Sequence, residues 1–106
     1  MFFELRQYKV LPGQMERWQQ FFEEEVLPFQ LAKGMVILGS FRGEDDPESW
    51  VWIRRFESEA ERERLYKDVY ESDHWKEEVG PQVPAMLDRS AMKVTRLVAT
   101  PHSVIQ

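Results

Sequence analysis

The sequence contains no cysteine, so disulfide bonds, thiolate nucleophiles and cysteine-ligated zinc are all excluded. No uninterrupted apolar run approaches the ~20 residues that cross a bilayer. Gly-rich phosphate loops, nucleophile elbows and metalloprotease motifs are also missing, which disfavours nucleotide-driven and hydrolytic chemistry. We therefore expect a soluble, cytoplasmic protein with no membrane partner.

Histidine and positive charge are both in short supply. The formal net charge of -5 gives a field that repels phosphate backbones, so we expect no nucleic-acid partner. The two histidines, His74 and His102, fall in different elements, with no carboxylate at a recognisable ligand spacing. The sequence therefore predicts neither a metal site nor a bound cofactor.

What is present indicates one globular domain spanning residues 1–106, with 42% hydrophobic and 31% charged residues. Residues 2–10 form an aromatic and β-branched run that ends at the turn Pro12-Gly13, which predicts a central strand. Residues 14–33 carry an apolar stripe at steps of three and four, which predicts a helix. Pro28 predicts a kink or break inside it, and Gly34 a left-handed cap at its end.

The remainder of the chain predicts three more strands and a second long helix. The strands are expected over 35–42, 49–56 and 91–100, and a capping box at Ser58 and Glu61 opens the helix. A short helix is expected over 74–79. The order strand, helix, strand, strand, helix, strand favours an α+β, ferredoxin-like sandwich. Its four-stranded antiparallel sheet has the first and third strands in the middle and both long helices on one face.

The sheet face left bare by the helices predicts a partner. The second strand has apolar residues on both of its faces. The third places Trp50 and Trp52 on one face and Val51 and Ile53 on the other. A face that carries these large aromatic side chains with no helix over it is unusual in a monomer, so we expect a homodimer through that sheet face. The alternative is that residues 79–87 fold under the sheet and cover that face within one chain.

Several segments together resemble the NIPSNAP family, in particular its short bacterial-type members. They are Glu4 to Tyr8, Pro12-Gly13, Val51 to Phe56, Tyr70 and Trp75-Lys76. The resemblance implies a dimeric α+β barrel in which two sheets face each other. The wider superfamily it resembles includes cofactor-independent monooxygenases, haem-degrading enzymes, lactone isomerases and dehydratases, usually with a pocket between sheet and helices. The resemblance itself supplies no reaction for this chain.

Three residues are candidates for chemistry. Arg6 and Tyr8 project from one face of the first strand, where Arg6 could hold a carboxylate or enolate oxygen and Tyr8 could donate a proton. The alternative for Arg6 is an internal salt bridge with Glu4 or a helix residue. His74 could serve as a general acid or base near neutral pH. Alternatively, it is a partly exposed residue of a first helical turn.

An aromatic ligand pocket is the other candidate site, although aromatics at helical spacing more often simply form a core. We expect its lining to include Trp18, Phe22, Trp52, Arg54 and Tyr70.

The leading hypothesis is a NIPSNAP-like homodimer that binds a small apolar or aromatic molecule. A cofactor-independent monooxygenase or isomerase acting on an enolisable small molecule is the second, and a non-catalytic interaction module the third. Whether the protein is an enzyme stays open. A cavity that joins Arg6 or Arg54 to His74 would favour catalysis.

Overall fold

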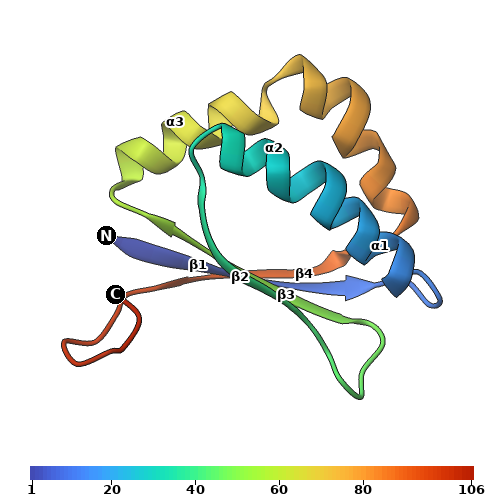
Figure 1. Cartoon of the computed structure of the whole chain (residues 1–106), viewed down its shortest axis with the longest axis horizontal. Coiled ribbons are helices and arrows are strands. Elements are labelled where there is room, and N and C mark those ends of the chain that lie inside the picture. Colours follow the sequence, from blue (N-terminus) through green and yellow to red (C-terminus); the bar gives the residue numbers. More distant parts are fainter.

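The computed structural model describes every residue of the chain, 1–106. Four strands form one antiparallel sheet, and all the helical segments lie over a single face of it (Figure 1). The strands are β1 (Phe2–Val10), β2 (Val36–Arg42), β3 (Ser49–Phe56) and β4 (Leu87–Leu97). The helices are α1 (Met15–Phe21), η1 (Phe22–Val26), α2 (Leu27–Ala32), α3 (Glu59–Tyr70), η2 (Trp75–Val79) and η3 (Gly80–Ala85). The predicted α+β, ferredoxin-like class is confirmed.

The strand order in the sheet is β2-β3-β1-β4, so β1 and β3 are central, as predicted. Glu4 of β1 pairs with Arg54 of β3, and Tyr8 pairs with Trp50. Directly paired residues of antiparallel strands project from the same face. This register therefore gathers polar side chains at one end of the helix-covered face and aromatic side chains at the other.

The first long helix is interrupted where the sequence predicted, but by a widened turn rather than a simple kink. Pro28 has no N–H to donate to the carbonyl of Glu24, so the α pattern cannot continue through it. The chain instead forms the π-helix η1, in which the Leu27 N–H donates to the Phe22 carbonyl five residues back. Gly34, at φ 101°, ends the helical region in the left-handed conformation expected of a cap.

The core lies between the sheet and the helices, and it corrects the role expected for two tryptophans. Trp50 and Trp52 are only 3% and 2% exposed, respectively, because α1 and η1 cover them. The Phe22 ring lies 5.0 Å from that of Trp50 and 5.1 Å from that of Trp52. The sequence could not tell which parity of β3 faces the helices, and the expectation that these aromatics form the uncovered face was wrong.

The chain between α3 and β4 also differs from expectation. The short helix expected over 74–79 is found as the π-helix η2, but the 3-10 helix η3 follows it directly instead of a turn. Strand β4 begins at Leu87 rather than 91 and ends at Leu97. Val79, Met86 and Leu87 belong to the core cluster under the helices. Residues 79–87 therefore cover the helical side of the sheet, and the alternative that they fold under its other face is wrong.

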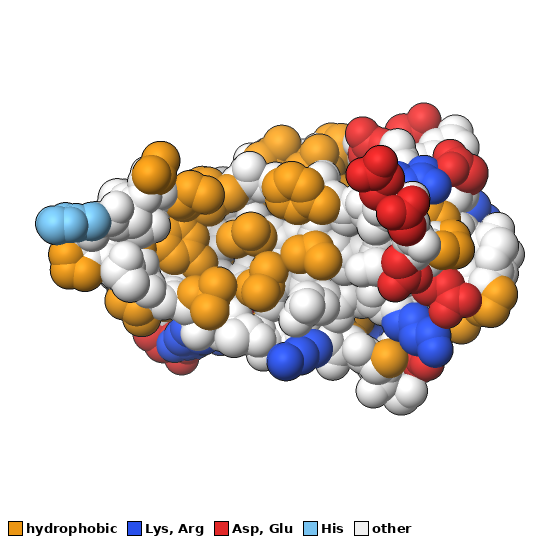
Figure 2. Space-filling model, turned by 90° about the horizontal axis from the view of Figure 1, so that it is seen from below, with side chains coloured by type: hydrophobic (Ala, Val, Ile, Leu, Met, Phe, Trp, Pro, Cys, Tyr) orange, Lys and Arg blue, Asp and Glu red, His pale blue; other side chains and the backbone are white.

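The opposite face of the sheet is bare, and hydrophobic side chains gather across it (Figure 2). Phe41 and Leu97 are 57% and 40% exposed, respectively. The C-terminal residues fold back toward this face, since Arg55 Nη1 donates to the backbone oxygen of Gln106 at 3.1 Å. No helix of the chain has the length and apolar character needed to cross a membrane.

Candidate functional site

A cavity of about 160 Å³ lies between the sheet and the helices. Most of its wall is apolar or aromatic, supplied by both central strands, by the two π-helices and by the start of β4. Three of the four tryptophans of the chain contribute to it. Its lining residues are Arg6, Tyr8, Trp18, Phe22, Val26, Gln30, Trp52, Tyr70, Trp75, Gly80, Val83, Leu87, Arg89 and Met92.

Arg6 and Tyr8 form the polar end of the cavity. Arg6 Nε donates to the Tyr8 hydroxyl at 2.7 Å, and the guanidinium lies 5.8 Å from the centre of the Trp52 ring. Arg6 Nη2 has only the thioether sulfur of Met92 as an acceptor, at 3.5 Å. Since sulfur is a weak acceptor, this N–H group keeps most of its capacity to bind an oxygen atom. Both predicted residues therefore lie together at a cavity.

Behind Arg6 lies a buried ion pair that holds it in place. Glu4 Oε1 accepts from Arg54 Nη2 at 2.6 Å and from Arg6 Nη1 at 3.2 Å. Tyr66 donates its hydroxyl proton to the same carboxylate at 2.7 Å, and Arg62 Nε reaches it at 3.3 Å. The salt bridge predicted as the alternative role of Arg6 therefore exists, and it coexists with the contact to the cavity.

The surroundings of Glu4 keep it ionised. Burial alone raises the pKa of this carboxyl, but the charge of Arg54 and the hydrogen bonds from Tyr66 and Arg54 outweigh burial and lower the pKa to about 2. Burial also raises the pKa of Tyr66, to about 12, and that of Tyr8. At neutral pH both phenols are therefore protonated, so each hydroxyl can donate a hydrogen bond.

Positive charge exceeds negative charge in this cluster. Three guanidinium groups meet the single carboxylate of Glu4, and only the outermost, that of Arg62, has a second acidic partner, Glu59. Arg54 is fully buried, with its side chain 0% exposed. Among the residues that line the cavity, the charged ones are both arginines, Arg6 and Arg89. The cavity therefore lies in a local positive field although the whole chain is acidic.

Several residues that line the cavity carry a hydrogen-bond donor with no acceptor in the chain. The Tyr70 hydroxyl accepts from Arg54 Nη1 at 2.8 Å and from Gln30 Nε2 at 3.2 Å, which leaves its own proton free to donate. Tyr8 likewise accepts from Arg6. The buried indole N–H of Trp18 has no acceptor in the chain. Unpaired buried donors carry a free-energy cost, which a ligand with acceptor oxygens would remove.

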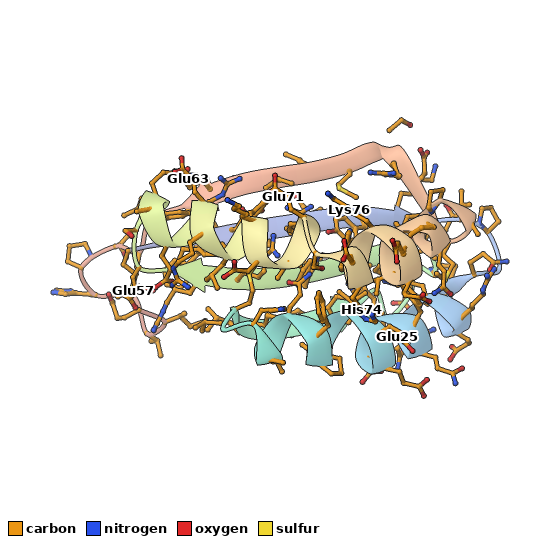
Figure 3. All side chains as sticks on the ribbon, turned by 90° about the horizontal axis from the view of Figure 1, so that it is seen from above. Glu25, Glu57, Glu63, Glu71, His74 and Lys76 are labelled. Carbon is orange, nitrogen blue, oxygen red and sulfur yellow. The ribbon has the colours of Figure 1, made fainter.

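The structure brings together most of the predicted site residues, but not all of them. Six line the cavity, namely Arg6, Tyr8, Trp18, Phe22, Trp52 and Tyr70. Arg54 does not reach the cavity wall; it lies behind Tyr70 and orients its hydroxyl. His74 is exposed on the outer, helical side of the molecule, where its ring packs 4.7 Å from that of Phe29 (Figure 3). The structure does not bring His74 to Arg6 or Tyr8.

Sequence reasoning missed four informative lining residues. Gln30 and Trp75 project from irregular or interrupted helices, where a simple 3.6-residue period gives the wrong face. Arg89 belongs to the part of β4 that precedes the expected start at residue 91, and Met92 lies inside the expected strand, where no pattern showed which face it occupies. An arginine directly before the last predicted strand was a possible signal, but nothing in the sequence placed it near the first strand.

Comparison with solved structures defines the fold class. A structure of a NIPSNAP family protein from Agrobacterium tumefaciens superposes with a TM-score of 0.88 at 18% identity, covering 99% of this chain and 98% of that one. An uncharacterised NIPSNAP domain protein from Burkholderia xenovorans gives 0.84 at 15% identity, over 97% and 98%. A structure of an antibiotic biosynthesis monooxygenase gives 0.71 at 17% identity, over 95% and 100%. At these identities the likeness shows the shared fold alone.

The sequence itself gives the family. The sequence model of the NIPSNAP family matches residues 3–102, which is nearly the whole chain. The protein therefore belongs to the NIPSNAP family, as the opening strand and the β3 segment Val51 to Phe56 suggested. A sequence comparison with curated proteins finds no match. The fold and the family are thus shown, while the function has to be argued from the cavity.

Proposed function

We propose that this NIPSNAP protein binds a small aromatic molecule carrying an anionic oxygen, with the ring in the cavity and the oxygen on Arg6. The observation that carries the proposal is the combination of an aromatic wall with charged lining groups of positive sign only. An aromatic ring fits the wall, and an anion fits the guanidinium.

The size of the cavity limits the ligand to about one ring. A cavity of about 160 Å³ is close to the ~150 Å³ that accommodates benzene in an engineered apolar core. It is well below the ~300–1,000 Å³ typical of drug-sized ligands. Fused multi-ring molecules would have to displace η2 or η3, whereas a single ring can pack in the cavity against the side chains of Trp18, Phe22 and Trp52.

The donors at the polar end indicate an acceptor rather than a donor on the ligand. Arg6 Nη2 and the hydroxyl protons of Tyr8 and Tyr70 all lack a strong acceptor. A carboxylate, phenolate or enolate oxygen accepts several such bonds at once. An ammonium group at the same place would meet the Arg6 charge and be repelled.

A catalytic role is the second candidate, and the cavity supports it less well. An oxygenase or isomerase acting on an enolisable carbon needs a group that removes a proton. No histidine, aspartate or glutamate lines the cavity, and burial keeps Tyr8 protonated by raising its pKa. A module with a completely filled core would have no cavity of this kind. These two observations favour ligand binding.

Ligand binding can be measured through the intrinsic fluorescence of the tryptophans, three of which line the cavity. Benzoate is the anionic probe, and benzyl alcohol and benzylamine are its neutral and cationic counterparts. We expect saturable quenching by benzoate, with the two other probes at least ~10-fold weaker, as expected for a charge-assisted hydrogen bond. Equal affinity for all three probes, or no saturation by benzoate, would contradict the proposal.

A variant series locates the bound anion. Arg6→Gln should weaken benzoate binding by roughly 10- to 100-fold, because it removes the charge-assisted bond in a buried site. Arg64→Gln is the matched control: it changes the net charge equally, but Arg64 is exposed on α3 and away from the cavity. Circular dichroism of both variants checks that the fold is retained. The same loss in both variants would mean that general charge, not the site, controls binding.

The proposed assembly is a homodimer through the bare face of the sheet. The support is the apolar surface on that face, to which Phe41 and Leu97 contribute large exposed areas. Gly39 lies beneath the Phe41 ring, since a Cβ atom built on it would approach that ring to 2.9 Å. The Phe41 ring thus lies over Gly39 and adds apolar surface on this face that a second sheet could contact.

A further inference from the structure

Strand β4 bulges widely where it passes Tyr8. Lys9 pairs with Asp88 and Gln7 with Lys93, so one residue of β1 lies opposite the four residues Arg89 to Met92. The Asp88 carboxylate accepts from the Ser90 N–H at 3.1 Å and from the Ser90 hydroxyl at 2.6 Å, which holds the start of the bulge. Bulges of this kind often redirect side chains next to a binding site.

The two ends of this bulge supply two of the cavity-lining residues. Arg89 and Met92 both line the cavity, and the Met92 sulfur is the weak acceptor of Arg6 described above. Arg89 is exposed, so it lies at the mouth of the cavity rather than in its interior. No carboxylate of the chain forms an ion pair with it.

The cavity thus has a cation at its inner end and another at its mouth. Arg6 is largely buried, with its side chain 13% exposed. Arg89 belongs to the four residues that lie opposite Tyr8, two positions along β1 from Arg6. At ~3.3 Å per residue the two positions are roughly 7 Å apart along the strand. Aromatic and aliphatic side chains separate them, and no acidic group lines the space.

We propose that Arg89 is a specificity-determining residue that binds a second anionic group, so that the preferred ligand is a one-ring aromatic molecule with acidic groups at both ends. This inference rests on the proposed function, because it assumes that the ring and the first anionic group occupy the cavity. A guanidinium without an acidic partner at the mouth can form two parallel hydrogen bonds to a carboxylate. Benzene-1,4-dicarboxylate has this arrangement of charges.

The test compares benzene-1,4-dicarboxylate with benzoate on the full chain by tryptophan fluorescence and by calorimetry. The wild type should bind the dicarboxylate roughly 10-fold more tightly than benzoate, because one more charge-assisted contact forms at a partly exposed site. Arg89→Gln should abolish this preference while weakening benzoate binding much less than Arg6→Gln does. Arg64→Gln has the same change of net charge and should retain the preference, which separates a local contact from a general field effect.

The outcomes separate two claims: that the cavity binds an aromatic anion, and that Arg89 selects a second anionic group. If the wild type binds benzoate and shows no preference for the dicarboxylate, Arg89 does not select a second anion, and the proposed function stands. A preference that survives Arg89→Gln leads to the same conclusion. If neither compound binds the wild type, both claims fail. Loss of the preference in Arg64→Gln as well would assign it to overall charge and overturn the role of Arg89.

Discussion

Glu4 is the acidic centre of the buried polar cluster, and it determines where the side chains of the surrounding arginines lie. It accepts hydrogen bonds from Arg54, Arg6 and Tyr66, so these groups are fixed before any ligand arrives. A single carboxylate cannot neutralise all the guanidinium groups that it meets. Arg6 therefore retains both its charge and a free N–H for the cavity, which is the basis of the proposed anion site.

The lowered pKa of Glu4 predicts acid sensitivity. The folded-state pKa of about 2 lies below the ordinary value of 4.5, so the stabilisation is complete above pH ~4.5 and disappears as the pH falls toward 2. Between pH 6 and pH 3 this one group should reduce the free energy of unfolding by about 2 kcal/mol. Urea unfolding of the wild type and of Glu4→Gln at the two pH values measures the difference.

The variant should show a flatter pH dependence, although it is less stable at every pH because Arg54 loses its charged partner. A direct control is the NMR titration of the Glu4 carboxyl carbon in the wild type. A midpoint near pH 2 supports the ion pair as the cause. A midpoint above pH ~4, or an unchanged pH slope in Glu4→Gln, contradicts it.

At the scale of elements, the two π-helices are placed beside the cavity. Phe22 and Val26 come from η1 and Trp75 from η2, and all three contribute to the cavity wall. A π-helical turn widens the helix by one residue and shifts the side chains that follow it. The sequence predicted the interruption at Pro28 because proline lacks an N–H. Pro81 follows η2 at the same distance at which Pro28 follows η1, but Gly80-Pro81 was interpreted only as the end of a short helix, so the widened turn before it was missed.

The start of α3 was fully predictable, because capping depends on local sequence. Ser58 Oγ accepts from the Glu61 N–H at 3.1 Å, and the Glu61 carboxylate accepts from the Glu57 N–H at 3.2 Å. Ser58→Ala should lower the free energy of unfolding by about 1 kcal/mol, measured by urea titration. Ser58→Asp keeps a capping oxygen and should restore most of the loss. Equal stability of all three proteins would mean that the cap contributes nothing.

The limits of β4 were less predictable than those of β3. The bounds expected for β3, 49–56, are those found, because its aromatic and β-branched run is flanked by clear turn residues. Strand β4 begins at Leu87, earlier than expected, since its first part pairs with β1 across a bulge. Pairing between the two ends of the chain leaves no local pattern, so Arg89 could not be assigned to the cavity from sequence.

At the scale of the whole molecule, the two faces of the sheet have different roles. The helical face contains the core, the ion cluster and the cavity, and the other face is bare and apolar (Figures 1 and 2). The sequence predicted one covered and one uncovered face correctly. It assigned Trp50 and Trp52 to the uncovered face. Both faces of β3 are apolar, and the alternation of side chains along a strand shows which face is buried only when the two faces differ in polarity.

This correction changes the variants that test the proposed dimer. Phe41→Glu places a charge on the bare face, and we expect it to shift the protein from dimer to monomer in analytical ultracentrifugation while the fold persists. Leu31→Glu is the matched control on the outer side of α2, where Leu31 is 49% exposed, and it should stay dimeric. A dimeric Phe41→Glu protein, or a monomeric wild type, would contradict the interface.

Trp50→Glu should instead unfold the chain, since Trp50 is buried under α1 and η1.

The most direct test of the proposed anion site is a crystal structure with 4-bromobenzoate, whose bromine atom is located by anomalous scattering. We expect the ring in the cavity, packed against Trp18, Phe22 and Trp52, and a carboxylate oxygen within hydrogen-bond distance of Arg6 Nη2. The cavity would then be a binding site for small aromatic anions. A bromine peak only on the bare sheet face, or a ring in the cavity with its carboxylate turned away from Arg6, would contradict that conclusion.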